Sequence, residues 1–326
     1  HDLGRAPGTC GCGALGFPCI RRLYPSQAWF LRELRLYGGA LGLITVSGGK
    51  TIMMLLAALA VACKHALLLI KPDQRFHYRI NYLRLREHFR VPSLVFHDGA
   101  VGGFKGAIVP GTPVLRILPY SRLSRPESSA LLDELDFDLM LADEMHCLSD
   151  RTSRRTARWI RAMAKKRGLI PFAGASGSAI KKKLDDVAHL SLFALGGGSP
   201  YPLDRGAVEA WGAVVDPVRD PDTQSPTYRA LRSAFAAQEG EPTLFDSLFG
   251  GAASAIREGI LRRVVKTPGV VSTRVSEATA SLSLRGDFRV PPMPPHITAL
   301  LADVRRRGIR PDGEELVENA DIVRCV

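Results

Sequence analysis

Short apolar runs alternate with helix-length segments along most of the first 200 residues, and this alternation constrains the fold most strongly. Strands joined through helices need crossover connections, which pair the strands in parallel and cover both faces of the sheet. Residues 23–200 are therefore predicted to form one doubly wound α/β domain. The predicted strands are 41–46, 66–70, 93–96, 114–118, 137–142 and 169–173, and the predicted helices are 25–37, 50–63, 74–89, 128–134, 152–166 and 181–192.

The two ends of the chain have a different texture. Residues 1–22 are rich in Gly, Cys and Arg without an apolar period, so we expect an arm. Residues 201–326 are predicted to form a mostly helical accessory or linker region, which does not repeat the pattern of the first part. Its predicted helices are 205–214, 227–237, 252–265, 295–306 and 313–319, and its predicted strands are 269–273 and 280–284.

The charge of the chain is unevenly distributed. The formal net charge is +12, but residues 1–200 carry 28 basic and 15 acidic side chains, whereas residues 201–326 carry 16 and 17. A basic half of this kind favours a polyanionic partner such as DNA, or RNA, and the alternative is a merely solubilising surface.

Membrane and disulfide-stabilised classes do not fit the composition. The longest apolar run, 52–63, is too short to span a bilayer, so no membrane association is expected. Six cysteines in 326 residues are too sparse for a disulfide scaffold, and a reducing, cytoplasmic setting fits best. The chain begins His1-Asp2 with no signal-peptide pattern, so we expect a trimmed chain or a piece of a longer one.

The segment 44–51, ITVSGGKT, is the strongest local motif. An apolar strand enters a small-residue turn and a helix begins directly after it, as a phosphate-binding loop requires. Backbone N–H groups would face the phosphates, Lys50 would reach the β and γ phosphates, and Thr51 would offer a hydroxyl to Mg²⁺. Ile44 replaces the first glycine of the usual pattern, and the alternative is an ordinary glycine turn. The predicted ATP-binding residues of this loop are Ser47, Gly48, Gly49, Lys50 and Thr51.

A second motif delivers two carboxylates to the end of an apolar strand, in the segment 139–146, LMLADEMH. Ligands of open parallel sheets bind at the carboxyl ends of the strands. Asp143 is therefore predicted to hold Mg²⁺ through water, and Glu144 to orient or deprotonate the attacking water. The alternative is a solvated acidic turn. The next predicted strand ends in Gly174-Ala175-Ser176-Gly177-Ser178, whose hydroxyl groups could reach the acidic motif, although such turns are common.

Two further features each allow two interpretations. The segment 151–167 carries eight cations and would either grip phosphates or form a solvated helix face with its apolar side packed inward. Cys10, Cys12 and Cys19 would either bind Zn²⁺, with His1 as a possible fourth ligand, or belong to an unliganded arm.

Taken together, the motifs SGGKT, DEMH and SGS resemble those of superfamily 2 DEAD/DEAH-box helicases and translocases. Long stretches, including LLLIKPDQRFHYR and RILPYSRLSR, resemble the Swi/Snf-like helicases of bacteriophages and prophages. The resemblance implies a RecA-like P-loop NTPase domain and an ATP-dependent motor acting on DNA in the cytoplasm of a bacterial host. By residue, it assigns Gln27 to adenine, His146, Ser176 and Ser178 to coupling, and Lys71, Tyr120 and Ser121 to the nucleic-acid backbone.

Enzymes of this superfamily hydrolyse ATP between two RecA-like domains, and residues 201–326 contain no second strand–helix alternation. We therefore expect the second domain in the full-length protein or in trans, with weak turnover without it. Two alternatives stay open. One is a non-catalytic nucleic-acid-binding adaptor with a helicase-like fold, and the other is a P-loop ATPase of another lineage completed by oligomerisation.

Overall fold

The structure is a computed structural model and describes residues 20, 22–45, 48–97, 103–166, 170–177, 183–216, 221–236 and 253–273. Several predictions fall outside these residues. They are the arm 1–19 with its three cysteines, the loop residue Ser47, the coupling residue Ser178, the helices 295–306 and 313–319, and the strand 280–284.

The described residues form an eight-stranded sheet in the order β4-β3-β5-β2-β6-β7-β1-β8. All neighbouring strands run parallel except β3 and β4, which are antiparallel. The strand β7 lies between β1, which leads into the glycine turn, and β6, which carries the two carboxylates. The strands are β1 (Gly39–Leu43), β2 (His65–Ile70), β3 (Ser93–His97), β4 (Phe104–Lys105), β5 (Val114–Pro119), β6 (Leu139–Asp143), β7 (Phe172–Ala175) and β8 (Val270–Ser272).

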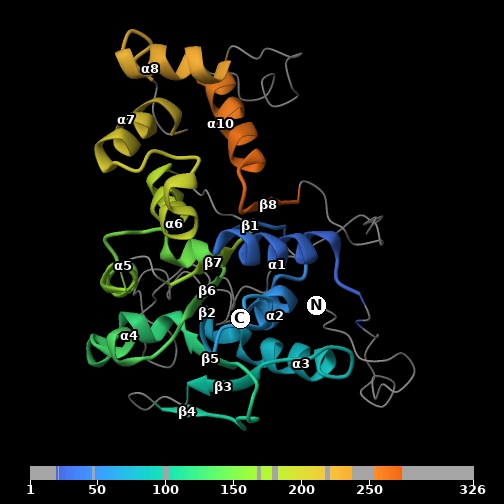
Figure 1. Ribbon diagram of the computed structural model, residues 1–326. Helices are drawn as coiled ribbons and strands as arrows, with labels where there is room; N and C mark the ends of the chain where they lie inside the picture. The colour runs from blue at the N-terminus through green and yellow to red at the C-terminus, as the bar shows by residue number, and fades with distance from the viewer. Residues whose placement is uncertain are drawn as a thin grey trace, which may run out of the picture. The chain divides into compact units, whose positions relative to one another are not determined.

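Helices cover both faces of this sheet, so the fold is α/β and RecA-like (Figure 1). Two buried clusters fill the spaces between the layers. One includes Phe30, Met53 and Tyr78 from the helices α1, α2 and α3, and the other includes Leu131, Trp159 and other side chains from α4, α5 and α6. The helices are α1 (Pro25–Tyr37), α2 (Lys50–Ala60), α3 (Arg75–Leu85), α4 (Leu131–Glu134), α5 (Arg154–Lys165), α6 (Asp185–Leu195), α7 (Arg205–Val215), α8 (Pro226–Leu231) and α10 (Ser254–Lys266).

The predicted doubly wound sheet is confirmed, with element ends that differ by a few residues. The strand predicted over 41–46 is β1 at Gly39–Leu43, because the chain leaves the sheet at Ile44 to enter the glycine turn. The strand predicted over 169–173 is β7 at Phe172–Ala175, and the helix predicted over 227–237 divides into α8 and a π-helix, η7 (Arg232–Ala236). The short antiparallel strand β4 was not predicted, because two residues give no periodic signal.

The helix predicted over 128–134 is wrong in length. Only Leu131–Glu134 is α-helical, and the 3-10 turns η3 (Tyr120–Ser124) and η4 (Pro126–Ser128) precede it. Guanidinium groups of α5 donate to the carbonyl oxygens of Leu123, Arg125 and Ser129, and the Arg125 carbonyl also accepts from the N–H of Ser128 within the turn. These tertiary contacts tie the 3-10 turns to α5.

The described part of the region after residue 200 packs on the second cluster. Val208, Tyr228 and Ile260 belong to the same buried cluster as Trp159, and β8 extends the sheet beside β1. Glu33, buried in α1, accepts a 2.8 Å hydrogen bond from the N–H of Gly269 just before β8. The boundary at residue 200 stays a prediction. Among the described helices, none is long and apolar enough to cross a bilayer.

Candidate nucleotide-binding site

The glycine turn after β1 is built by two residues that need to be glycine. Gly49 has a left-handed backbone, with φ of 70°, and is the residue from which α2 begins. A Cβ atom on Gly49 would lie 2.0 Å from Gln27 Nε2, and one on Gly48 would lie 2.5 Å from the Ile44 side chain. The turn therefore leads through Gly49 into the N-terminus of α2, and a helix N-terminus favours a bound anion.

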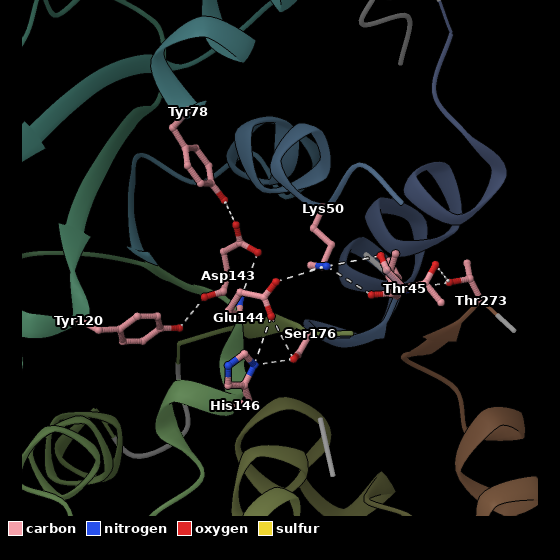
Figure 2. Close-up of polar contacts among 10 residues, drawn as sticks. Thr45, Lys50, Tyr78, Tyr120, Asp143, Glu144, His146, Ser176 and Thr273 are labelled. Carbon is pink, nitrogen blue, oxygen red and sulfur yellow. Dashed lines mark hydrogen bonds and ion pairs between the residues drawn. The ribbon is translucent and has the colours of Figure 1, made fainter. Parts of the chain in front are cut away.

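Lys50, the first residue of α2, lies against both the turn and the acidic strand end (Figure 2). Its Nζ atom is 3.4 Å from the carbonyl oxygens of Ile44 and Thr45, and 3.4 Å from Glu144 Oε1. The fold thus brings the two strongest sequence motifs, which are 93 residues apart, into one half-buried site.

Asp143 and Glu144 end β6 in different environments. The Asp143 side chain is buried, and burial raises its pKa although a hydrogen bond from Tyr78 opposes the shift. Burial alone would also raise the pKa of Glu144, but contacts with His146 and Lys50 outweigh it and lower the pKa to about 2. Glu144 has a left-handed backbone, with φ of 54°, which is rare outside glycine and typical of strained functional positions.

His146 and Ser176 meet at the carboxylate of Glu144, as Figure 2 shows. His146 Nδ1 lies 2.8 Å from Ser176 Oγ and 3.2 Å from Glu144 Oε2, and Ser176 Oγ donates to the same carboxylate oxygen at 3.2 Å. The backbone N–H of Ser176 donates to the carbonyl of Gly42 at the end of β1. His146 and Ser176 therefore converge on Glu144, and the Ser176 backbone connects this group to β1.

Two buried tyrosines contact Asp143, and neither contact was predicted, although the sequence indicated Tyr120 as a site residue for another role. The hydroxyl of Tyr78, in α3, donates to Asp143 Oδ2 at 2.6 Å, and the hydroxyl of Tyr120 donates to the Asp143 carbonyl at 2.8 Å. Tyr120 was expected at the nucleic-acid backbone, but its side chain is 1% exposed and contacts the acidic motif instead. No sequence signal indicated Tyr78, because its pairing with Asp143 depends on where α3 crosses the sheet.

Gln27, predicted to bind adenine, has both side-chain groups in internal hydrogen bonds. Its Oε1 atom accepts from the N–H of Tyr24 at 2.9 Å, and its Nε2 atom donates to the carbonyl of Gly49 at 3.1 Å. Each group retains capacity for one more hydrogen bond. Contact with adenine stays a prediction, and the observed role is to hold the glycine turn against α1.

For the basic segment 151–167 we expected either contact with phosphates or a solvated helix face with its apolar side packed inward. The structure agrees with only part of the second interpretation. Trp159 and Met163 pack inward, as the second one predicted. Several of the cations, however, bind this chain. Arg158 and Arg161 donate to backbone carbonyls of 123–129, Lys165 pairs with Asp133 at 2.8 Å, and Arg155 and Lys166 lie over aromatic rings. Much of the positive charge of α5 therefore anchors the segment between β5 and β6.

Lys71 and Ser121, predicted to contact nucleic acid, follow the carboxyl ends of β2 and β5. Lys71 is partly exposed and Ser121 is exposed. They lie at the same edge of the sheet as Lys50 and Asp143, because all these strands run parallel. Thr273, just after β8, was not predicted, and its Oγ1 accepts a 3.1 Å hydrogen bond from the N–H of Thr45.

The residues predicted to hold Mg²⁺ carry side chains of the kind that this ion binds. Asp143 and Thr51 both offer hard oxygen donors, and Asp143 accepts a hydrogen bond from the Tyr78 hydroxyl. Such donors suit Mg²⁺ completed by phosphate and water. Among the described residues, no group of three or more His, Cys, Asp or Glu side chains forms a metal cluster. Zinc at Cys10, Cys12 and Cys19 stays a prediction, because these residues lie outside the described ones.

Comparison with known proteins gives weak structural similarity and no match by sequence. No protein-family model matches the chain, and no curated protein matches it. Among solved structures, the chain is similar to the Sulfolobus solfataricus SWI2/SNF2 ATPase core in complex with dsDNA, at 15% sequence identity and a TM-score of 0.42. The match covers 77% of this chain and 44% of that chain, so it spans less than half of that neighbour. This similarity assigns neither a family nor an activity.

Proposed function

We propose that the chain binds Mg·ATP at the edge formed by β1, β6 and β7, and that it is the N-terminal motor part of a superfamily 2 helicase or translocase of the phage Swi/Snf-like type. The observation that carries the proposal is the convergence of Lys50 and Glu144, with their side chains 3.4 Å apart, next to the glycine turn. A helix N-terminus and a lysine suit the phosphates, and an ionised carboxylate suits a water molecule that attacks them.

The residues divide the proposed reaction between them. Backbone groups of the glycine turn and Lys50 would bind the phosphates, and Thr51 and Asp143 would hold Mg²⁺, which neutralises phosphate charge when bound. Glu144 would orient or deprotonate the attacking water, and its low pKa keeps it ionised at neutral pH. His146 and Ser176 would fix the Glu144 carboxylate, and a second RecA-like domain would complete the site.

Nucleic acid is the proposed partner at the same edge of the sheet. The excess positive charge lies in residues 1–200, and Lys71 and Ser121 are accessible beside the nucleotide site. Two alternatives remain as proposals: a non-catalytic adaptor that binds nucleic acid, and a P-loop ATPase completed by an oligomeric neighbour. The proposed location is the cytoplasm of a bacterial host.

Lys50→Ala tests the nucleotide site. We expect Mg·ATPγS to raise the melting temperature of the wild-type protein, because a ligand that binds only the folded state stabilises it. The shift should disappear in Lys50→Ala, which loses the phosphate-binding cation. Differential scanning fluorimetry over a range of ATPγS concentrations measures both effects.

Lys64→Ala is the matched control for this experiment. Lys64 carries the same charge but is exposed immediately before β2, at the opposite edge of the sheet. We expect the wild-type shift in this variant. An absent shift in the wild-type protein, or equal shifts in Lys50→Ala and Lys64→Ala, would contradict the proposed nucleotide site.

A further inference from the structure

Tyr78 is a buried side chain at the site whose hydroxyl group has no part in the function proposed above. The side chain is fully buried, and its hydroxyl donates a 2.6 Å hydrogen bond to Asp143 Oδ2 (Figure 2). One tyrosine hydroxyl from α3 therefore contacts the carboxylate proposed to hold magnesium.

The two oxygens of the Asp143 carboxylate are each held by one donor. Tyr78 donates to Oδ2, and the N–H of Glu144 donates to Oδ1 at 3.0 Å. The Asp143 side chain is 2% exposed, so bulk water cannot orient it. Two donors from different elements fix the plane of the carboxylate, and each oxygen keeps lone pairs for another partner.

The position of the Tyr78 hydroxyl is itself fixed by packing. The ring lies in the cluster that contains Met53 and Leu85, on the face of the sheet covered by α2 and α3. The helix α3 follows β2 through a 3-10 turn, η2 (Pro72–Gln74), in which the N–H of Gln74 donates to the Lys71 carbonyl. A rigid ring on a packed helix can hold a carboxylate more firmly than a mobile surface donor can.

From these contacts we propose that Tyr78 is a positioning residue of the magnesium site. Its hydroxyl holds the Asp143 carboxylate in the orientation that receives a magnesium-bound water, and it makes α3 a structural part of the site. This inference rests on the proposed function, since it needs the site to bind Mg·ATP. Partners that orient metal-binding groups typically change metal affinity by about 10- to 100-fold when removed.

The test is the magnesium dependence of nucleotide binding in Tyr78→Phe, measured on the whole chain. Equilibrium dialysis with radiolabelled ATPγS gives the Mg²⁺ concentration for half-maximal binding, and the same measurement in EDTA gives metal-free binding. We expect the half-maximal Mg²⁺ concentration to rise about 10- to 100-fold in Tyr78→Phe. Binding in EDTA should stay at the wild-type value, because the glycine turn and Lys50 are intact.

Two tyrosines outside the site provide matched controls. Tyr82 lies one turn further along α3 and is half-buried. Tyr201 is buried like Tyr78, but it lies after α6 and outside the site. Tyr82→Phe and Tyr201→Phe should both keep the wild-type magnesium dependence. Incorporation of 4-fluorophenylalanine at position 78 fills the place of the hydroxyl with fluorine but removes the donor. It should raise the half-maximal Mg²⁺ concentration as Tyr78→Phe does, and this variant serves if Tyr78→Phe does not fold.

The outcomes separate this inference from the proposed function. A wild-type protein that binds no ATPγS at any Mg²⁺ concentration would overturn both. Magnesium-dependent binding that is equal in the wild type and Tyr78→Phe would overturn the role of Tyr78 alone. An equal loss of binding with and without magnesium would indicate general structural damage, and it too would overturn the positioning role.

Discussion

At the scale of single residues, Glu144 combines two unfavourable features with three stabilising contacts. Its backbone is left-handed, which is unfavourable for a residue with a side chain, and its carboxylate is removed from most solvent. Lys50, His146 and Ser176 compensate by surrounding the carboxylate with three polar partners. Such an arrangement keeps the charge in place, and it also makes the position of Glu144 depend on three different elements.

Glu144→Gln should separate binding from hydrolysis. Glutamine has nearly the same shape and still fits among the polar partners, so we expect Mg·ATPγS binding to remain. It cannot accept a proton from water, and the rate of ATP hydrolysis under nucleic-acid stimulation should fall by about 10²- to 10⁴-fold. Phosphate-release assays measure the rate, and hydrolysis at the wild-type rate in Glu144→Gln would contradict its assignment as the base.

At the scale of elements, α5 acts as an anchor for the chain between β5 and β6. Its guanidinium groups donate to the carbonyl oxygens of Leu123 and Ser129, and a buried face around Trp159 holds α5 on the sheet. The anchored segment includes Tyr120, whose hydroxyl reaches the carbonyl of Asp143. The charges of α5 are therefore linked by packing to the acidic motif.

Arg158→Ala tests the anchor. The substitution leaves the carbonyl groups of Leu123 and Arg125 without this donor, and we expect the free energy of unfolding to fall by about 1–3 kcal/mol. Arg154→Ala removes an exposed arginine of the same helix and should change it by less than about 0.5 kcal/mol. Urea denaturation followed by circular dichroism measures both values. Equal effects of the two substitutions would argue against a specific anchor.

At the scale of the whole molecule, the parallel topology brings the candidate site residues to one edge of the sheet. Because the strands are parallel, the residues after β1, β2, β5, β6 and β7 all gather there. The helix α3 begins at this edge with exposed Arg75 and Arg79, close in sequence to Lys71. These three cations are candidate contacts for the phosphate backbone in the proposed interface.

Nucleic-acid binding should therefore weaken with salt. With about three phosphate contacts, the logarithm of the binding constant should fall with the logarithm of salt concentration with a slope of about −2 to −3. Lys71→Ala should reduce the magnitude of the slope by about one, and Lys64→Ala, at the opposite edge, should not change it. Fluorescence anisotropy with single- and double-stranded oligonucleotides measures the slope, and binding that is insensitive to salt would contradict the proposed interface.

The sequence by itself determined the parallel sheet, the glycine turn and the paired carboxylates, because apolar periodicity and turn chemistry are local properties. The resemblance of its motifs to those of a known family also indicated His146 and Ser176, and Ser176 follows directly from a strand end. Only the tertiary structure decided that Tyr78 and Tyr120 contact Asp143, and that α5 anchors a neighbouring segment. It also decided that β8 pairs with β1 and that Thr273 bonds Thr45 at the glycine turn. These contacts join residues distant in the chain, and they depend on how helices pack across the sheet, for which no local sequence pattern exists.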